Sequence, residues 1–361
     1  VIALIVKVAG VNWINKLMPA QVIGPTVAII GLSLAGNAIG DLQAASFDTA
    51  NTYLCILVGL VTLGVTMVCS VYGKGFIKMI PFVMGIVAGY ALAAILTVIG
   101  DATGNEALRM INFAAFENMQ WVPDFTFITA FKGFGEITGS YIVTVLVAYV
   151  PVAFVVFAEH IADHTNLGTI INKDLLNEEP GLDRTLLGDG VGSIVGTFFG
   201  ICPNTTYGES VGCVAITKNA SVKTIFTAAI MLIVLAFLSP VTAALRTIPS
   251  CVMGGVCLTL YGFIAVSGLK MFKQVDLDDS KNLFTVSAIL IAGIGGLSIQ
   301  IPYAIDNGVV SNTITITAVA TALFLGVATY AVANLIEKVW GEKKAPEAVT
   351  FEDFDKEEEN K

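Results

Sequence analysis

The sequence predicts an all-α polytopic membrane protein, on the basis of its composition and of long apolar runs that recur throughout. Of the 361 residues, 55% are hydrophobic and 13% are charged, and the mean hydropathy is +0.81. A soluble domain typically carries about 25% charged residues. Each apolar run approaches the roughly 20 residues that cross a bilayer as a helix. Disordered, collagen-like and coiled-coil classes are therefore excluded.

The spans follow from the apolar runs between charged or turn-rich breaks. A partial span covers 1–9, and because Val1 lies inside an apolar run we expect the sequence to begin partway through a longer protein. Ten further spans are predicted at 19–40, 52–72, 76–100, 137–170, 185–201, 205–217, 222–239, 250–269, 282–299 and 312–336.

Lys and Arg residues set the predicted orientation, because cytoplasmic loops carry an excess of them. With Lys7 and Lys16 inside, alternation of the spans places fourteen basic residues in the cytoplasm and three outside, tail excluded. The three outside are Arg109, Lys132 and Arg246. The segment 345–361 carries seven acids against two lysines, which is −5 of the net charge of −9. We expect it to be a solvated cytoplasmic tail.

Other composition features exclude further kinds of site. No basic stripe supports nucleic-acid binding. The six cysteines form no CxxC pair and the chain has two histidines, so neither a disulfide framework nor a zinc site is indicated.

Two predicted spans have abnormal lengths: 137–170 is long and 205–217 is short. The residues 202–206, Cys-Pro-Asn-Thr-Thr, are interpreted as a short extended segment before a half-helix that starts near Tyr207 and Gly208. Non-helical backbone at membrane depth survives only where protein or a water-filled cavity covers it. Broken spans of this kind indicate a transporter's binding site.

Two polar clusters at membrane depth are candidates for function. In the first, Glu159 and Asp163 share one helix face, as do His160 and His164. Two neighbouring acids suit a proton carrier; the alternative is that the helix has already reached the cytoplasmic interface. Asp189, near the start of its span, is interpreted as interfacial.

The second cluster is the polar segment 204–209, which ends at Glu209 in the first turn of the half-helix. The helix dipole stabilises a carboxylate there, and free amide groups point towards the break. A simple capping acid would explain Glu209 but not six consecutive polar residues. Together the clusters predict a site for a small polar solute, coupled to protons.

Four segments resemble the nucleobase:cation symporter (nucleobase–ascorbate transporter) family, and most of all its bacterial uracil permease branch. They are AEHIADH (158–164), KDLL (173–176), PGLDR (180–184) and PNTTYGESVGCVAITK (203–218). The resemblance implies fourteen spans in two inverted seven-span repeats, of which this chain lacks the first three.

The resemblance also implies a division into core and gate domains. The core domain comprises the end of a span at 1–18 and the spans of 137–239, which hold the substrate site. The gate domain comprises 19–100 in the first repeat and 240–338 in the second. An extracellular loop covers 101–136, and the tail covers 339–361.

Site roles come from the same resemblance. Glu159, Gly208 and Glu209 match residues that contact the nucleobase, and Tyr207 and Tyr261 are weaker candidates. Asp163 takes the place of a family histidine that is implicated in proton coupling, so Asp163, His164 and Glu159 are the coupling candidates.

The expected activity is proton-coupled uracil import across the cytoplasmic membrane by alternating access, without a cofactor, in a homodimer formed through the gate domain. Glutamate at 209 favours uracil, because an ionised carboxylate only accepts hydrogen bonds. Xanthine or another purine is the alternative, and an enzyme is not expected.

Overall fold

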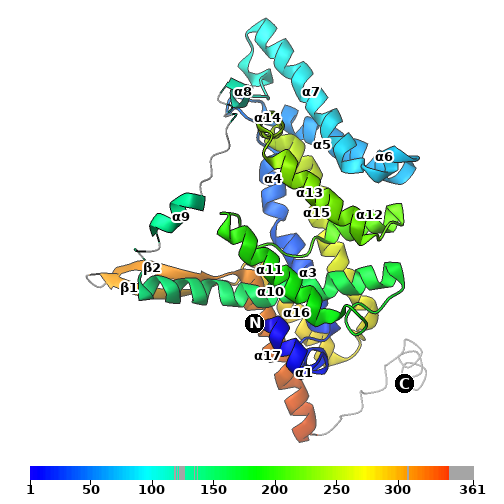
Figure 1. The fold of residues 1–361 in the computed structure, drawn as a ribbon, viewed down its shortest axis with the longest axis vertical. Coiled ribbons are helices and arrows are strands. Elements are labelled where there is room, and N and C mark those ends of the chain that lie inside the picture. Colours follow the sequence, from blue (N-terminus) through cyan, green and yellow to red (C-terminus); the bar gives the residue numbers. More distant parts are fainter. Residues whose placement is uncertain are drawn as a thin grey trace, which may run out of the picture.

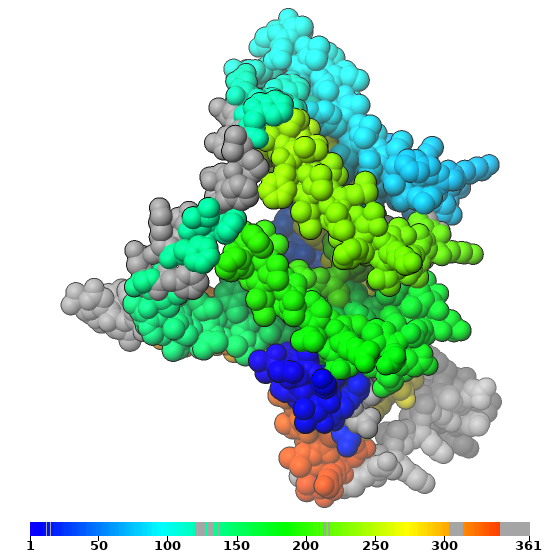
Figure 2. Space-filling view, viewed as in Figure 1, coloured from blue at the N-terminus to red at the C-terminus, as the bar shows by residue number. Residues whose placement is uncertain are grey.

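The computed structural model is mostly helical, and it describes residues 1–117, 119, 121, 127–133, 135, 137–306 and 309–340. Figure 1 shows α5 and α7 at one end of the molecule, α10 across its middle and α17 at the other end, and the space-filling view of Figure 2 shows the same order. The residues beyond Trp340 include the tail that is predicted to be solvated, and they lie outside the described residues.

The helices of the first part of the chain precede the long loop. They are α1 (Ile2–Ala9), α2 (Asn12–Leu17), α3 (Ala20–Ser33), α4 (Ala35–Leu42), α5 (Thr52–Tyr72), α6 (Phe76–Met79) and α7 (Pro81–Thr103). The loop itself contains the 3-10 helix η1 (Glu106–Leu108) and the short helices α8 (Ala114–Glu117) and α9 (Phe127–Gly133).

The second part of the chain contains eight helices longer than four residues and one strand pair among its described residues. The helices are α10 (Gly139–Ile171), α11 (Gly181–Phe198), α12 (Gly208–Thr217), α13 (Val222–Ala236), α14 (Ser239–Arg246), α15 (Ser250–Lys270), α16 (Ser280–Ile294) and α17 (Ala318–Trp340). A 3-10 turn, η3 (Met271–Gln274), continues α15, and β1 (Ile299–Asp306) pairs antiparallel with β2 (Val309–Ile316).

Each of the ten predicted spans contains a helix, but fewer have the dimensions of a full crossing. Within the described part of the chain, six helical segments are long and apolar enough to cross a membrane, and seven if the bent pair α13 and α14 forms one span. The chain is therefore a multi-pass membrane protein, while the count of ten and the inverted repeats stay predictions.

The purely all-α expectation is wrong in one place. The spans predicted at 282–299 and 312–336 are shortened by the β1–β2 pair, since α16 ends at Ile294 and α17 begins at Ala318. Residues 312–316 are rich in Thr and Ile, which fit a strand as well as an apolar helix. In Figure 1 the pair lies along α10, which β2 contacts.

The helices α3, α4 and α5 pack closely on α15, and α7 packs on α5. Small residues permit this approach, as is common between membrane helices. A Cβ atom on Gly268 of α15 would collide with the backbone nitrogen of Ala28 in α3. A Cβ atom on Gly31 of α3 would lie 2.5 Å from the backbone nitrogen of Ala265. The crossing of α3 and α15 therefore depends on glycine on both sides.

We expect Gly268→Ala to destabilise the protein by about 1–3 kcal/mol, because the added methyl group forces α3 and α15 apart. The measurement is the melting temperature of the full-length protein in detergent. Gly262→Ala is the matched control on the same helix, since a Cβ atom there meets nothing within 4 Å. Equal melting temperatures for the two variants would contradict the close crossing.

Candidate substrate site

The site is built around the break between α11 and α12. Residues 201–207 are neither helix nor strand, and α12 begins at Gly208, where the sequence predicted a half-helix to start. Tyr207 is the N-cap residue in an extended conformation, with φ −113° and ψ 90°. The amide groups of the first turn of α12 therefore point towards the break.

Three consecutive residues of the break donate hydrogen bonds to three carboxylates. The Asn204 side-chain Nδ2 lies 3.2 Å from Asp189 Oδ1, the Thr205 hydroxyl 3.0 Å from Glu159 Oε2 and the Thr206 hydroxyl 2.7 Å from Asp163 Oδ2. Glu159 and Asp163 come from α10, and Asp189 comes from α11. The break is thus held to both helices by charge-assisted bonds, which are stronger than neutral ones.

Gly208 permits the closest approach between the break and α10. A Cβ atom at this position would lie 3.0 Å from Asp163 Oδ1. Any larger residue would push against the carboxylate that Thr206 binds. The side chain of Asp163 is 6% exposed.

A cavity of about 560 Å³ adjoins these groups. Glu159, Asp163 and Gly208 line one side of it, and α15 supplies the apolar Phe263, Ile264 and Val266 together with Ser267. Lys270, at the close of α15, and Lys273, in η3, also line it. The volume and mixed lining fit a small-molecule ligand.

The remaining residues predicted to contact the substrate are Tyr207, Tyr261 and Glu209. Tyr207 is 63% exposed. Tyr261 lies on α15 one turn after Cys257, with which its side chain interacts, and it is not among the residues that line the cavity. The backbone of Glu209 belongs to the first turn of α12, but its side chain lies outside the described part of the structure.

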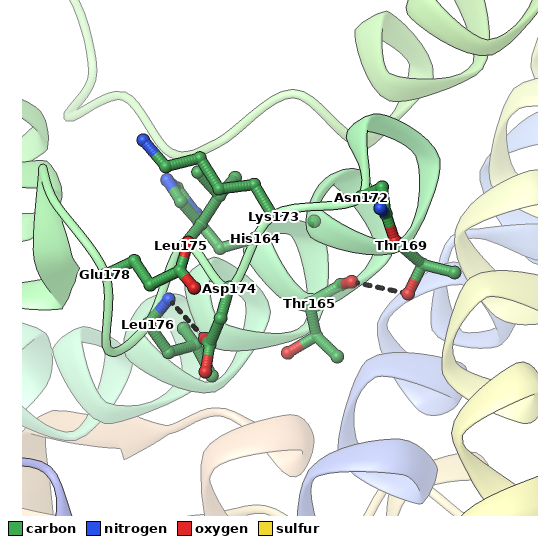
Figure 3. A pocket seen from close by; sticks show the side chains of 10 residues that line it. His164, Thr165, Thr169, Asn172, Lys173, Asp174, Leu175, Leu176 and Glu178 are labelled. Atoms are coloured by element: carbon green, nitrogen blue, oxygen red, sulfur yellow. Dashed lines mark hydrogen bonds between the residues drawn. The ribbon is translucent and has the colours of Figure 1, made fainter.

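His164 faces a second cavity, of about 350 Å³, at the end of α10 (Figure 3). Its ring stacks on His160 with the centroids 4.0 Å apart, and its Nδ1 lies 2.9 Å from the carbonyl oxygen of His160. In the turn that follows, Asp174 accepts hydrogen bonds from Asn177 and from the Leu176 amide, which lower the pKa of its carboxyl group.

The sequence did not predict the role of Asp189 in this arrangement. It contacts His160 and Asn204, and its side chain is 13% exposed, while its interfacial depth stays a prediction. One signal in the sequence could have indicated this: Asp189 lies in the same predicted span as several glycines. One of them, Gly192, lies against the break, since a Cβ atom there would be 3.2 Å from Asn204 Nδ2.

Comparison with known proteins connects this site to a family. The model of a family described as "Permease family" matches residues 1–301. The uracil permease of Bacillus caldolyticus is 38% identical over 329 residues, which cover 91% of this chain and 70% of that protein. The uracil permease of Escherichia coli K12 is 37% identical over 318 residues, covering 87% and 68%.

A third relative, the uracil permease of Bacillus subtilis, is 34% identical over 305 residues, 83% of this chain and 66% of that protein. The chain thus spans about two thirds of the length of these relatives. The matches confirm the relationship that the segments at 158–164 and 203–218 indicated. The chain belongs to the permease family, and is a membrane transporter rather than an enzyme.

Proposed function

We propose that this chain forms the greater part of a proton-coupled symporter that imports uracil across the cytoplasmic membrane by alternating access. The proposal rests mainly on one observation: Glu159, Asp163 and Gly208 line the same cavity beside the broken span. Relatives that carry the name uracil permease support uracil as the substrate.

The chemistry of the site suits a flat amide-type ring. Uracil presents two ring N–H donors and two carbonyl acceptors. An ionised carboxylate only accepts hydrogen bonds and has about four acceptor positions. Glu159 therefore keeps acceptor capacity beyond the bond from Thr205, and it accepts one ring N–H in the proposed complex. Glu209 accepts the second, and backbone amides near Gly208 donate to a ring carbonyl.

In the proposed cycle, α10 to α13 form the moving core and the helices around α3 and α15 form the gate. A proton enters with uracil and reduces the negative charge of the loaded core, with Asp163, His164 and Glu159 as the acceptors that the sequence indicates. Rocking of one unit against another around a fixed site is the general pattern for transporters built from inverted repeats. The tail is cytoplasmic, and two gate domains pair in a homodimer.

The function is tested by uptake of radiolabelled uracil into proteoliposomes that contain the full-length protein. An inward proton gradient should drive accumulation above equilibrium, and an uncoupler should abolish it. Uptake that is driven by a sodium gradient instead would show that Na⁺, and not H⁺, is the coupling ion. Absence of uracil uptake under both gradients would contradict the proposed substrate.

The alternative substrate class, xanthine or another purine, is separated by competition. A tenfold excess of unlabelled xanthine should leave uracil uptake unchanged, because the family resemblance associates glutamate at position 209 with uracil rather than with purines. Strong inhibition by xanthine, with weak inhibition by unlabelled uracil, would assign the protein to the purine branch.

We expect Glu209→Gln to weaken uracil binding by about tenfold or more, since a hydrogen bond to a charged group contributes about 1.5–3 kcal/mol. The measurement is the dissociation constant of uracil for the full-length protein in detergent. Glu179→Gln is the control, because that side chain is 86% exposed on the turn before α11. Equal affinity in both variants would remove Glu209 from the site.

A further inference from the structure

The cavity beside the broken span extends along α10 past the two acids. Its lining residues on this helix begin at Glu159 and end at Ile170, about 16 Å along the axis at 1.5 Å per residue. A volume of about 560 Å³ is of the size that holds drug-sized ligands, and a single pyrimidine ring is much smaller. A uracil molecule held by Glu159 and Gly208 therefore leaves part of the cavity unfilled.

Asn166 lies in this further part of the cavity. It follows Asp163 by three residues and Glu159 by seven, so the three side chains lie on one face of α10, and all three line the cavity. The step from Glu159 to Asn166 is about 10 Å along the axis. It leads towards the end of α10 that is predicted to be cytoplasmic. A ring that leaves the acids in this direction passes Asn166.

A hydrogen bond to α15 holds the Asn166 side chain in place. Its Nδ2 donates to the Ser267 hydroxyl over 2.6 Å, and Ser267 also lines the cavity. A carboxamide has two donor hydrogens and an acceptor oxygen with two lone pairs. One bond to Ser267 therefore leaves at least one donor and one acceptor of Asn166 for a ligand. This is true for either orientation of the amide group, since exchanging its nitrogen and oxygen also uses only one position.

The remaining groups of Asn166 complement an edge of a pyrimidine base. In uracil a ring N–H stands beside a carbonyl group, so this edge presents one donor and one acceptor, which a carboxamide can meet with two hydrogen bonds. Phe263 and Ile264 of α15 line the same cavity and offer apolar contact to the ring. Neutral hydrogen bonds are weaker than those to a carboxylate. A ring at Asn166 is therefore held less tightly than a ring at Glu159, as suits a position that the substrate must leave.

We propose that Asn166 forms a second binding position for a pyrimidine that has an N–H beside a carbonyl group. The position lies between the acids and the end of α10, and the ring transfers to it from Glu159 before release. Ser267 orients the carboxamide and is a positioning residue. This inference rests on the proposed transport of uracil.

The test compares binding and movement of uracil in the full-length protein. The dissociation constant is measured in detergent, and exchange of radiolabelled uracil at equal pH is measured in proteoliposomes. Asn166→Leu keeps nearly the same size but has neither donor nor acceptor. It should slow exchange by about tenfold or more, because two neutral hydrogen bonds to the ring are lost. The dissociation constant should stay within about threefold, since the charge-assisted bonds at Glu159 and Glu209 are unchanged.

Two further variants separate binding of the ring from a bond that only links two helices. Ser267→Ala removes the bond between α10 and α15 but leaves the carboxamide, so exchange should fall by no more than about threefold. A bond that only links the helices is lost equally in Ser267→Ala and in Asn166→Leu. Asn37→Leu is the matched control and should exchange uracil like the wild type, because Asn37 is exposed on α4 and does not line the cavity.

The outcomes separate this inference from the proposed function. A wild-type protein that moves no uracil would contradict the proposed function, and the inference with it. An active wild type, with exchange unchanged in Asn166→Leu or slowed equally in Asn166→Leu and Ser267→Ala, would overturn the second position alone. A dissociation constant raised tenfold in Asn166→Leu would overturn it as well, by placing Asn166 in the site of Glu159. If Asn166→Leu does not fold, Asn166→Ala removes the same donor and acceptor and takes its place.

Discussion

The candidate site depends on the hydrogen bonds that join three successive residues of the break to three carboxylates. A helix satisfies its backbone groups internally, whereas residues 201–207 need partners from elsewhere, and membrane interiors offer no water for them. The backbone carbonyl oxygen of Asn204 accepts a hydrogen bond from the Ser193 hydroxyl of α11. The side chains of Asn204, Thr205 and Thr206 add bonds to acids of α10 and α11. The buried Asp163 benefits in turn, because a buried carboxylate is stable only when it is hydrogen-bonded or paired. Neither the break nor the acids would be favourable alone.

This mutual requirement explains the small residue at the start of α12. Asp163 binds Thr206 through Oδ2, and its Oδ1 lies where the Cβ atom of a residue at 208 would come within 3.0 Å. Glycine therefore lets the carboxylate sit against the first turn of α12, whose amide groups and dipole favour negative charge. The same contact leaves the Asp163 carboxylate at the wall of the cavity.

The positions of the break and of the half-helix could be predicted from the local sequence, whereas the hydrogen bonds between distant residues could not. Pro203 and the two threonines mark the break, and Gly208 marks the start of the half-helix, because each acts on the backbone at its own position. The pairing of Thr205 with Glu159 joins residues 46 positions apart, and that of Asn204 with Asp189 depends on how α11 packs. No pattern along the chain gives such contacts. The β1–β2 pair was not predicted, because Ile299 and 312–316 fit the ends of two apolar spans as well as a strand, and 300–311 lies between those predicted spans.

The distribution of polar bonds also bears on the proposed movement. The three bonds that hold the break lie within the group formed by α10, α11 and α12, so this group can move without losing them. At the boundary with α15, Asn166 Nδ2 donates to the Ser267 hydroxyl over 2.6 Å, and the wall of the cavity there is otherwise largely apolar. An exchangeable neutral hydrogen bond contributes about 0.5–1.5 kcal/mol. By contrast, the glycine contacts between α3 and α15 lock those helices together. The helices α10 and α3 also share one hydrophobic core, to which Ile161 and Val27 belong. The two units therefore meet mainly through apolar contacts, which are non-directional, while their directional polar bonds lie inside the unit of α10, α11 and α12.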